Sequence, residues 1–440
     1  MYAERMKMVG LRLGVFVLAC LFQAAASAMA PIQHWTTRNG ARVYFVPAHD
    51  LPMVDVRVVF DAGSARDGKH PGVARLTNAL LATGAGKLDA DALAEGLESV
   101  GAELDNGALR DMAWLTLRSL TEPRALRKAV SLFGLIVQHP RFDAEDFRRE
   151  RERLRVSLQL DAQQPGRIAE RAFYRAVYDG HPYANPVKGT EKGLAALRRR
   201  DVLDFHHRFY VARNAVVAIV GDLDRQRAER LAEAVVGALP AGRRAPALPP
   251  VKDLAAPREV RIAHEATQAH ILCGQPGMRR GDPDYFPLYV GNYILGGGGL
   301  VSRISREVRE KRGLSYSAYS YFLPMARRGP FILGLQTRAD QADEALRVLR
   351  RTLAEFVSRG PTEAELQAAI RHITGSYPLR IDSNRKILEY VAMIGFYDLP
   401  LDYLERFNAR VAAVTRRQVM DAFRRRVHPD RLVTVVVGAR

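Results

Sequence analysis

Hydrophobic and polar positions repeat along the chain in a way that divides it into two similar halves. Near residues 41–63 and again near residues 259–277, apolar and polar residues alternate with the two-residue period of a half-buried strand. A short apolar helix, further strands and long amphipathic helices follow in each half. Because the strands are grouped and do not alternate with helices, the pattern predicts an α+β fold in layers, not a doubly wound parallel sheet.

The closing segment of each half supports a duplication. Residues 201–221 align with residues 418–438 at an offset of 217 without a gap. Both segments have the pattern of an amphipathic helix, a turn and a β-branched run that ends at glycine. Six identities in 21 positions are weak evidence by themselves, but the same elements in the same order at the end of both halves strengthen it.

A segment rich in proline and alanine separates the two halves. Residues 239–257 have no amphipathic period and are typical of an interdomain linker. We therefore predict an N-terminal domain over residues 32–238 and a C-terminal domain over residues 258–440.

Residues 1–28 have the pattern of a secretory signal peptide. Basic residues precede an apolar run over residues 13–22, and a small-x-small cleavage sequence ends at Ala28. The run is short for a membrane span, so cleavage is favoured over an uncleaved anchor, and no span is expected afterwards. Lipid anchoring at Cys20 is a minor alternative. The sequence thus predicts a periplasmic or secreted protein.

Composition narrows the class of protein. The 440 residues are 48% hydrophobic and 26% charged, as is ordinary for a globular chain. Once the signal peptide is removed, Cys273 is the remaining cysteine, so the domains depend on their cores and not on disulfides. The formal charge of +18 comes largely from arginines spread along helical segments, without a glycine–aromatic motif or a basic tail. We therefore expect solvated helix faces and no nucleic-acid partner.

Four stretches, residues 60–86, 181–222, 268–277 and 295–322, carry a family resemblance. In order and spacing, the chain resembles the insulinase/pitrilysin family of inverted-zincin peptidases, and most closely its shorter, processing-peptidase-like branch. The resemblance covers nearly all of residues 32–440. It implies a fold of the α+β class, with two homologous α/β-layer domains that face each other as a clamshell.

The metal motif of that family is missing from this chain. In a typical member, the two histidines of H-x-x-E-H bind zinc, the glutamate between them acts as a general base, and a later glutamate completes the ligands. The matching positions here hold Arg75, Asn78 and Ala79, and the later ligand falls at Ser157 in the best register, with two glutamates nearby. A guanidinium stays protonated and alanine has no ligand atom. We therefore predict a degenerate site at which this chain binds no metal.

Other candidate groups are weaker. His264 and His270 lie six residues apart in a strand-like run, and His206 and His207 point in different directions on a predicted helix. For both pairs a structural or surface role is preferred. Glycines 296–299 lack the Lys-Ser/Thr of a P-loop, so they predict either a close-packed turn or a flexible substrate-contacting loop.

The C-terminal half keeps a different part of the family's machinery. The segment before Gly313 has the pattern of a helix that this glycine ends, and a strand is predicted from about Ser315. In the family, an arginine at the end of this helix and a tyrosine seven residues later face the zinc across the cleft. Arg309 and Tyr316 match them, and such groups can bind a substrate carbonyl and stabilise the oxyanion. The alternative is a helix-end cation beside a packed strand tyrosine.

The resemblance implies that paired members divide the catalytic groups between two chains. This chain fits the non-metal-binding subunit of a heterodimeric zinc peptidase, inactive alone. Its partner would be a homologous subunit with H-x-x-E-H and the zinc, and Arg309 and Tyr316 would act on that site in trans. The substrate would be an extended peptide, bound partly by adding a strand to a sheet edge. A structural or peptide-binding non-catalytic member and an independent hydrolase with an unrecognised site remain as alternatives.

Overall fold

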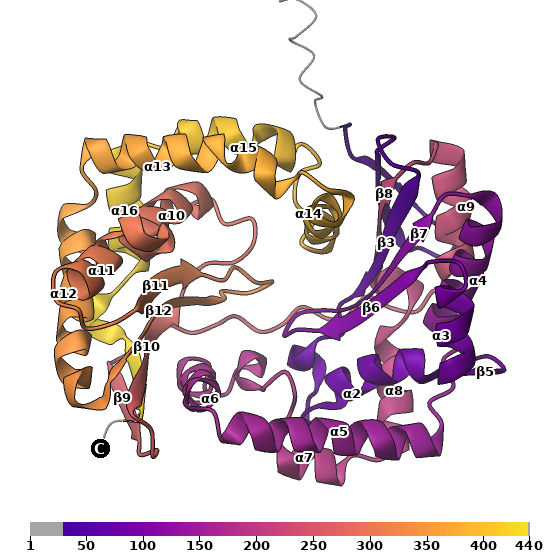
Figure 1. Cartoon of the computed structure of the whole chain (residues 1–440), viewed down its shortest axis with the longest axis horizontal. Coiled ribbons are helices and arrows are strands. Elements are labelled where there is room, and N and C mark those ends of the chain that lie inside the picture. Colours follow the sequence, from indigo (N-terminus) through magenta and orange to yellow (C-terminus); the bar gives the residue numbers. More distant parts are fainter. Residues whose placement is uncertain (1–29, 439–440) are drawn as a thin grey trace, which may run out of the picture. The chain divides into compact units, whose positions relative to one another are not determined.

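Strands rich in β-branched and aromatic residues form one sheet in the N-terminal half (Figure 1). The computed structural model describes residues 30–438, so the predicted signal peptide and Cys20 lie outside the described residues. The strand order is β1-β2-β8-β3-β7-β6, with β2 and β8 parallel and the other pairs antiparallel. Its strands are β1 (Gln33–Thr36), β2 (Arg42–Pro47), β3 (Met53–Phe60), β6 (Glu103–Ala108), β7 (Ala113–Leu120) and β8 (Ala215–Gly221).

The C-terminal half contains a second sheet with the same topology. Its order is β11-β12-β10-β13-β9, and again one pair, β9 with β13, is parallel. Reversed, this order corresponds strand for strand to β2-β8-β3-β7-β6. Its strands are β9 (Arg258–Ile262), β10 (Gln268–Pro276), β11 (Ser317–Phe322), β12 (Pro330–Arg338) and β13 (Val433–Val437). The predicted fold class, with two homologous α/β-layer domains, is confirmed.

Helices form the remaining layers, and several begin at recognisable caps. Asp89 accepts a hydrogen bond from the amide of Ala92 at the start of α3, and Thr362 forms a capping box with Glu365 at the start of α13. The helices of the N-terminal half are α2 (Val73–Leu80), α3 (Ala90–Glu98), α4 (Pro123–Gln138), α5 (Ala144–Ala162), α6 (Pro165–Val177), α7 (Glu191–Ala196), α8 (Arg199–Phe209) and α9 (Arg225–Val236). Those of the C-terminal half are α10 (Tyr285–Asn292), α11 (Arg303–Ser305), α12 (Ala342–Arg359), α13 (Glu363–Gly375), α14 (Asn384–Phe396), α15 (Tyr403–Ala412) and α16 (Arg416–Arg426). A two-residue hairpin, β4 (Gly84–Ala85) and β5 (Leu88–Asp89), lies between α2 and α3.

Each half sends one helix onto the sheet of the other half. Helix α6 packs on β10 and β13, and α14 packs on β8 and β3 (Figure 1). Glycines make room at both contacts: a Cβ on Gly274 would lie 2.8 Å from the ring of Phe173, and one on Gly395 would lie 2.7 Å from the ring of Tyr44. Because the cores are completed across the halves, we expect residues 32–438 to unfold as a unit.

A buried carboxylate also joins the halves. The oxygens of Asp111 accept hydrogen bonds from the hydroxyls of Tyr183 at 2.7 Å and Tyr397 at 3.0 Å, and from the amide of Ala326 at 2.7 Å. The hydroxyl of Tyr183 accepts in turn from the amide of Arg327 at 2.9 Å. Burial raises the pKa of Asp111. Two elements of each half thus meet at one carboxylate.

The segment over residues 239–257 contains no helix or strand, but it is packed against the C-terminal half. The guanidinium of Arg327 donates to the carbonyl of Leu248 at 2.6 Å, and that of Arg328 donates to the carbonyl of Val251 at 2.7 Å. Both aliphatic side chains are buried. Among residues 30–438, none of the helices combines the length and apolar character needed to cross a bilayer.

Candidate functional site

Helix α2, which matches the metal-bearing helix, is built as predicted but from a glycine start. Gly72 has φ +99° and its amide donates to the Asp67 carboxylate at 2.7 Å, while the amide of Ala74 donates to the other oxygen at 2.9 Å. The carboxylate of Asp67 therefore caps the helix N-terminus. Burial raises its pKa to about 7. The helix frame is intact although its metal ligands are absent.

Asn78 occupies the position of the general base and has a structural role. Its side chain is fully buried, and its amide donates to the carbonyl of Trp114 at 3.1 Å. The side-chain amide of Asn106 donates to the main-chain carbonyl of Asn78 at 2.6 Å and to its side-chain oxygen at 3.1 Å. Asn78 therefore ties α2 to β6 and β7 and has no free group directed at a substrate.

The positions of the metal ligands hold groups that do not fit a zinc ion. Arg75 and Ala79 are half-buried on α2, and Ser157 lies on α5, which packs against α2. The ammonium of Lys188 donates to the hydroxyl of Ser157 at 2.8 Å and pairs with Asp161 at 2.8 Å. The guanidinium of Arg75 would repel a metal ion here, and the hydroxyl of Ser157 is already hydrogen-bonded to a lysine. Within residues 30–438, no three His, Cys, Asp or Glu side chains are close enough together to hold one.

The remaining histidines are structural or exposed. His206 is buried, stacks on Tyr210 with ring centroids 5.0 Å apart, and has no hydrogen-bond partner for Nε2. His207 is exposed. The strand-like run over residues 264–270 is not continuous, since β10 begins at Gln268 and half-buried His264 lies in the preceding loop.

Replacing His206 by phenylalanine is expected to reduce the loss of stability in acid. Burial lowers the pKa of His206 to about 4 from 6.5, so between these values the unfolded chain binds the extra proton. The free energy of unfolding of the wild type should fall by about 2 kcal/mol between pH 7 and pH 5 through this residue. Urea denaturation at both pH values measures the difference, with His207→Gln as the exposed control. An unchanged pH dependence in the phenylalanine variant would contradict this assignment.

Arg309 and Tyr316 lie together in the C-terminal half of the chain. Helix α11 continues into a π-helical turn over Arg306–Glu310, and Gly313, at φ +62°, ends it by donating to the carbonyl of Arg309 at 2.9 Å. The strand begins at Ser317, two residues later than predicted. The guanidinium of Arg309 lies 4.5 Å from the centroid of the Tyr316 ring, and Tyr316 is 87% exposed. Half-buried Arg309 is thus stacked on a tyrosine ring that is open to solvent.

Tyr316 lines a cavity of about 850 Å³ that is rich in tyrosine. Three tyrosines on one face of α10 and the turn after it, and two on β11, supply most of the aromatic surface. The β11 pair stacks with ring centroids 5.8 Å apart. These residues are Tyr285, Tyr289, Tyr293, Tyr319 and Tyr321. Such walls offer flat apolar faces together with hydroxyl groups, which suits the side chains of a peptide.

The glycine run forms one wall of this cavity. A Cβ on Gly296 would lie 2.4 Å from the hydroxyl of Ser320, so close packing requires glycine there. The amide of Asn292 donates to the carbonyl of Ser320 at 3.0 Å and fixes the same contact. Gly299 has φ +62° and open space around it. The close-packed turn is therefore correct for the start of the run, and the run also faces the cavity.

Sequence reasoning missed most of the cavity. The spacing of Tyr285, Tyr289 and Tyr293 at every fourth residue was a signal for one helix face, and Tyr319 and Tyr321 alternate on one strand face. Arg280 and Arg380, which also line the cavity, are 100 residues apart and left no such signal.

Comparisons with known proteins agree with this architecture. Residues 43–191 match the family described as insulinase (peptidase family M16), and residues 196–373 match the peptidase M16 inactive domain. The solved structure of a peptidase M16 inactive domain from Pseudomonas fluorescens is 39% identical, covers 93% of this chain and 98% of its own, and has a TM-score of 0.90. An uncharacterised zinc protease of Streptomyces coelicolor is 28% identical over 76% of this chain and 74% of its own. A non-peptidase homologue of Helicobacter pylori is 22% identical over 90% and 91%.

Proposed function

The chain belongs to the insulinase family (peptidase family M16), and from this premise we propose that it is the non-metal-binding subunit of a heterodimeric zinc peptidase. One observation carries the proposal. Arg75 and the hydrogen-bonded Asn78 stand where the zinc ligand and the base would be, while half-buried Arg309 remains stacked on the exposed Tyr316. A subunit with one half of a divided site has this combination.

The chemistry assigned to this chain is recognition of the scissile carbonyl. The guanidinium of Arg309 and the hydroxyl of Tyr316 donate hydrogen bonds to the oxygen on which negative charge develops. The partner subunit would hold the zinc and the general base, and these would supply the activation of water. The cation–π contact holds Arg309 over the Tyr316 ring before a partner arrives, so less conformational freedom is lost on assembly.

An extended peptide is the substrate class that suits this arrangement. The two sheets end in β6 and β11 on the corresponding side. The carbonyl of Ser320 in β11 already accepts from Asn292, and the glycine run packs there. That leaves β6 as the better edge for strand addition by a peptide. With the signal peptide predicted at residues 1–28, we place this activity in the periplasm or outside the cell.

A non-catalytic peptide-binding or structural role is the second candidate. The observation in its favour is the similarity to the non-peptidase homologue of Helicobacter pylori over nine-tenths of both chains. It predicts that the cavity binds peptides but that no partner gains activity from this chain.

Reconstitution with a homologous subunit that contains H-x-x-E-H tests the proposal. We expect peptidase activity from the purified pair, little from either chain alone, loss of activity with a chelator, and one zinc per heterodimer by elemental analysis. Each chain alone, at the same concentration, is the control. Full activity of the zinc-containing chain without this one would overturn the division of the site and leave the second candidate.

A further inference from the structure

A second cavity, of about 680 Å³, gathers four arginines from both halves of the chain. Arg57 lies on β3 and Arg110 follows β6, so both belong to the N-terminal half. Arg280 follows β10, and Arg380 ends the 3-10 turn Tyr377–Arg380 before α14, so both belong to the C-terminal half. Four guanidinium groups from distant positions therefore line one cavity.

Among the described residues, none of these four arginines has a carboxylate within ion-pair distance. Arg57 donates to the hydroxyl of Thr116 at 2.8 Å, Arg110 to the carbonyl of Tyr183 at 3.1 Å, and Arg280 to the carbonyl of Pro324 at 3.1 Å. These neutral acceptors orient three of the four side chains and form no ion pair with them.

Arginines elsewhere on the chain are commonly paired, for example Arg303 with Glu365 at 2.6 Å and Arg425 with Asp284 at 2.8 Å. The four arginines of the cavity differ from these because they form no ion pairs with the described part of the chain. Guanidinium groups without an ion-pair partner in a partly enclosed cavity favour an anionic ligand.

The acidic groups of the same cavity offset only part of this charge. Asp111 is buried and its oxygens are occupied by Tyr183, Tyr397 and Ala326. Glu389 is exposed and attracts Arg57 electrostatically without forming an ion pair with it, and Lys386, also in the lining, pairs with Asp382 at 2.8 Å. The cavity is therefore positive, and its free donors are guanidinium N–H groups.

This cavity adjoins the tyrosine-lined one. Arg280, Leu323, Pro324 and Arg380 line both of them, and Tyr316 lines the first. A peptide that contacts Tyr316 in the first cavity can therefore extend into the arginine-lined cavity.

We propose that the arginine-lined cavity binds the acidic side chains of a peptide, so that this chain selects substrates rich in aspartate and glutamate. The role in substrate selection rests on the proposed function, whereas the binding of an acidic peptide requires only this chain. Carboxylates match the planar fork of arginine and bind it in a bidentate manner. The apolar Leu323 and Met325 beside the arginines lower the local dielectric and strengthen the pairing.

Fluorescence anisotropy with this chain alone tests the proposal. Three labelled peptides of equal length are compared: one acidic with an amidated C-terminus, one neutral with a free C-terminus, and one basic with an amidated C-terminus. We expect the acidic peptide to bind most tightly, and salt to weaken it. The Arg280→Gln/Arg380→Gln variant should bind it at least about tenfold more weakly, the size expected for the loss of charge-assisted hydrogen bonds.

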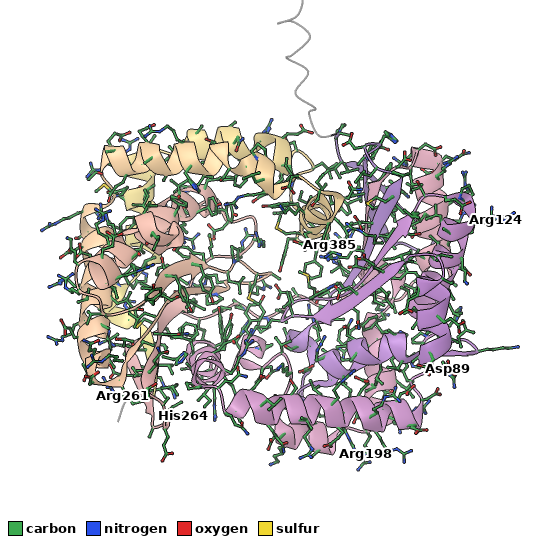
Figure 2. All side chains as sticks on the ribbon, in the orientation of Figure 1. Asp89, Arg124, Arg198, Arg261, His264 and Arg385 are labelled. Carbon is green, nitrogen blue, oxygen red and sulfur yellow. The ribbon has the colours of Figure 1, made fainter. Side chains whose placement is uncertain are left out.

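The matched control is Arg124→Gln/Arg200→Gln, which removes the same charge from the exterior. Figure 2 shows Arg124 pointing outwards from α4, and the side chain of Arg200 is 87% exposed. Circular dichroism and thermal unfolding establish that both variants are folded. If both variants bind the acidic peptide equally weakly, the effect comes from the net charge of the protein, and the proposed site is wrong.

Binding that follows the free C-terminus, or equal binding of acidic and basic peptides, would overturn the assignment to acidic side chains. A pair without peptidase activity would defeat the proposed function and leave this binding result intact. An active pair with no preference for acidic peptides would support the proposed function and contradict the selection of acidic substrates by this cavity.

Discussion

Replacing Arg309 by alanine should lower the kcat/KM of a reconstituted pair by about 10²–10³, the usual cost of losing one donor to a developing oxyanion. The guanidinium is one of the two groups that we assign to the scissile carbonyl, and it also holds the ring of Tyr316 at 4.5 Å. Its loss therefore removes a charge-assisted hydrogen bond and loosens the second donor. The decrease should fall mainly on kcat, because the bond is stronger in the transition state than in the bound substrate.

Variants of the same helix separate catalysis from stability. Arg306→Ala is the matched control, since Arg306 lies one turn earlier and its partner is Glu365 at 3.6 Å. It should leave kcat/KM unchanged within a few fold. Tyr316→Phe keeps the ring under Arg309 and removes the hydroxyl, so a loss smaller than that of Arg309→Ala is expected. Full activity in both Arg309→Ala and Tyr316→Phe, with heterodimer formation intact, would show that the pair plays no part in the chemistry.

The sequence contained the repeat of the fold because duplication leaves local patterns. The offset of 217 carries α8, Arg199–Phe209, onto α16, Arg416–Arg426, residue for residue. Amphipathic period, β-branched runs and terminal glycines are set by neighbours along the chain, and they survive divergence of most side chains. The exchange of α6 and α14 between the halves was not predictable in this way. It depends on which sheet face each helix meets in three dimensions.

The candidate site was predictable only in part, for a related reason. Arg309 and Tyr316 are seven residues apart, on a helix end and the strand that follows, so a local motif places both. The second cavity is assembled from Arg57, Arg110 and two arginines of the other half, and each looks like an ordinary surface arginine in the sequence. Their lack of carboxylate partners becomes visible only when the halves are packed together. The same is true of Asp111, whose partners lie as far away as Tyr397.

Asp111→Ala should lower the free energy of unfolding by about 3–5 kcal/mol, within the range for removing one partner from a buried charged network. The variant leaves the hydroxyls of Tyr183 and Tyr397 and the amide of Ala326 without their acceptor in a buried place. Chemical denaturation measures the loss. Tyr397→Phe removes a single donor and should cost about 1 kcal/mol.

The location of the network gives this variant a second consequence that a simple core defect would not have. Tyr397 and Ala326 belong to the C-terminal half, whereas Asp111 and Tyr183 belong to the N-terminal half. Weaker contacts between the halves should expose the segment over residues 239–257, so limited proteolysis should cut this segment faster in Asp111→Ala. Phe133→Ala, a cavity in the N-terminal core, is the control of comparable size. Equal cleavage of the two variants at this segment would mean that Asp111 stabilises the N-terminal core and does not join the halves.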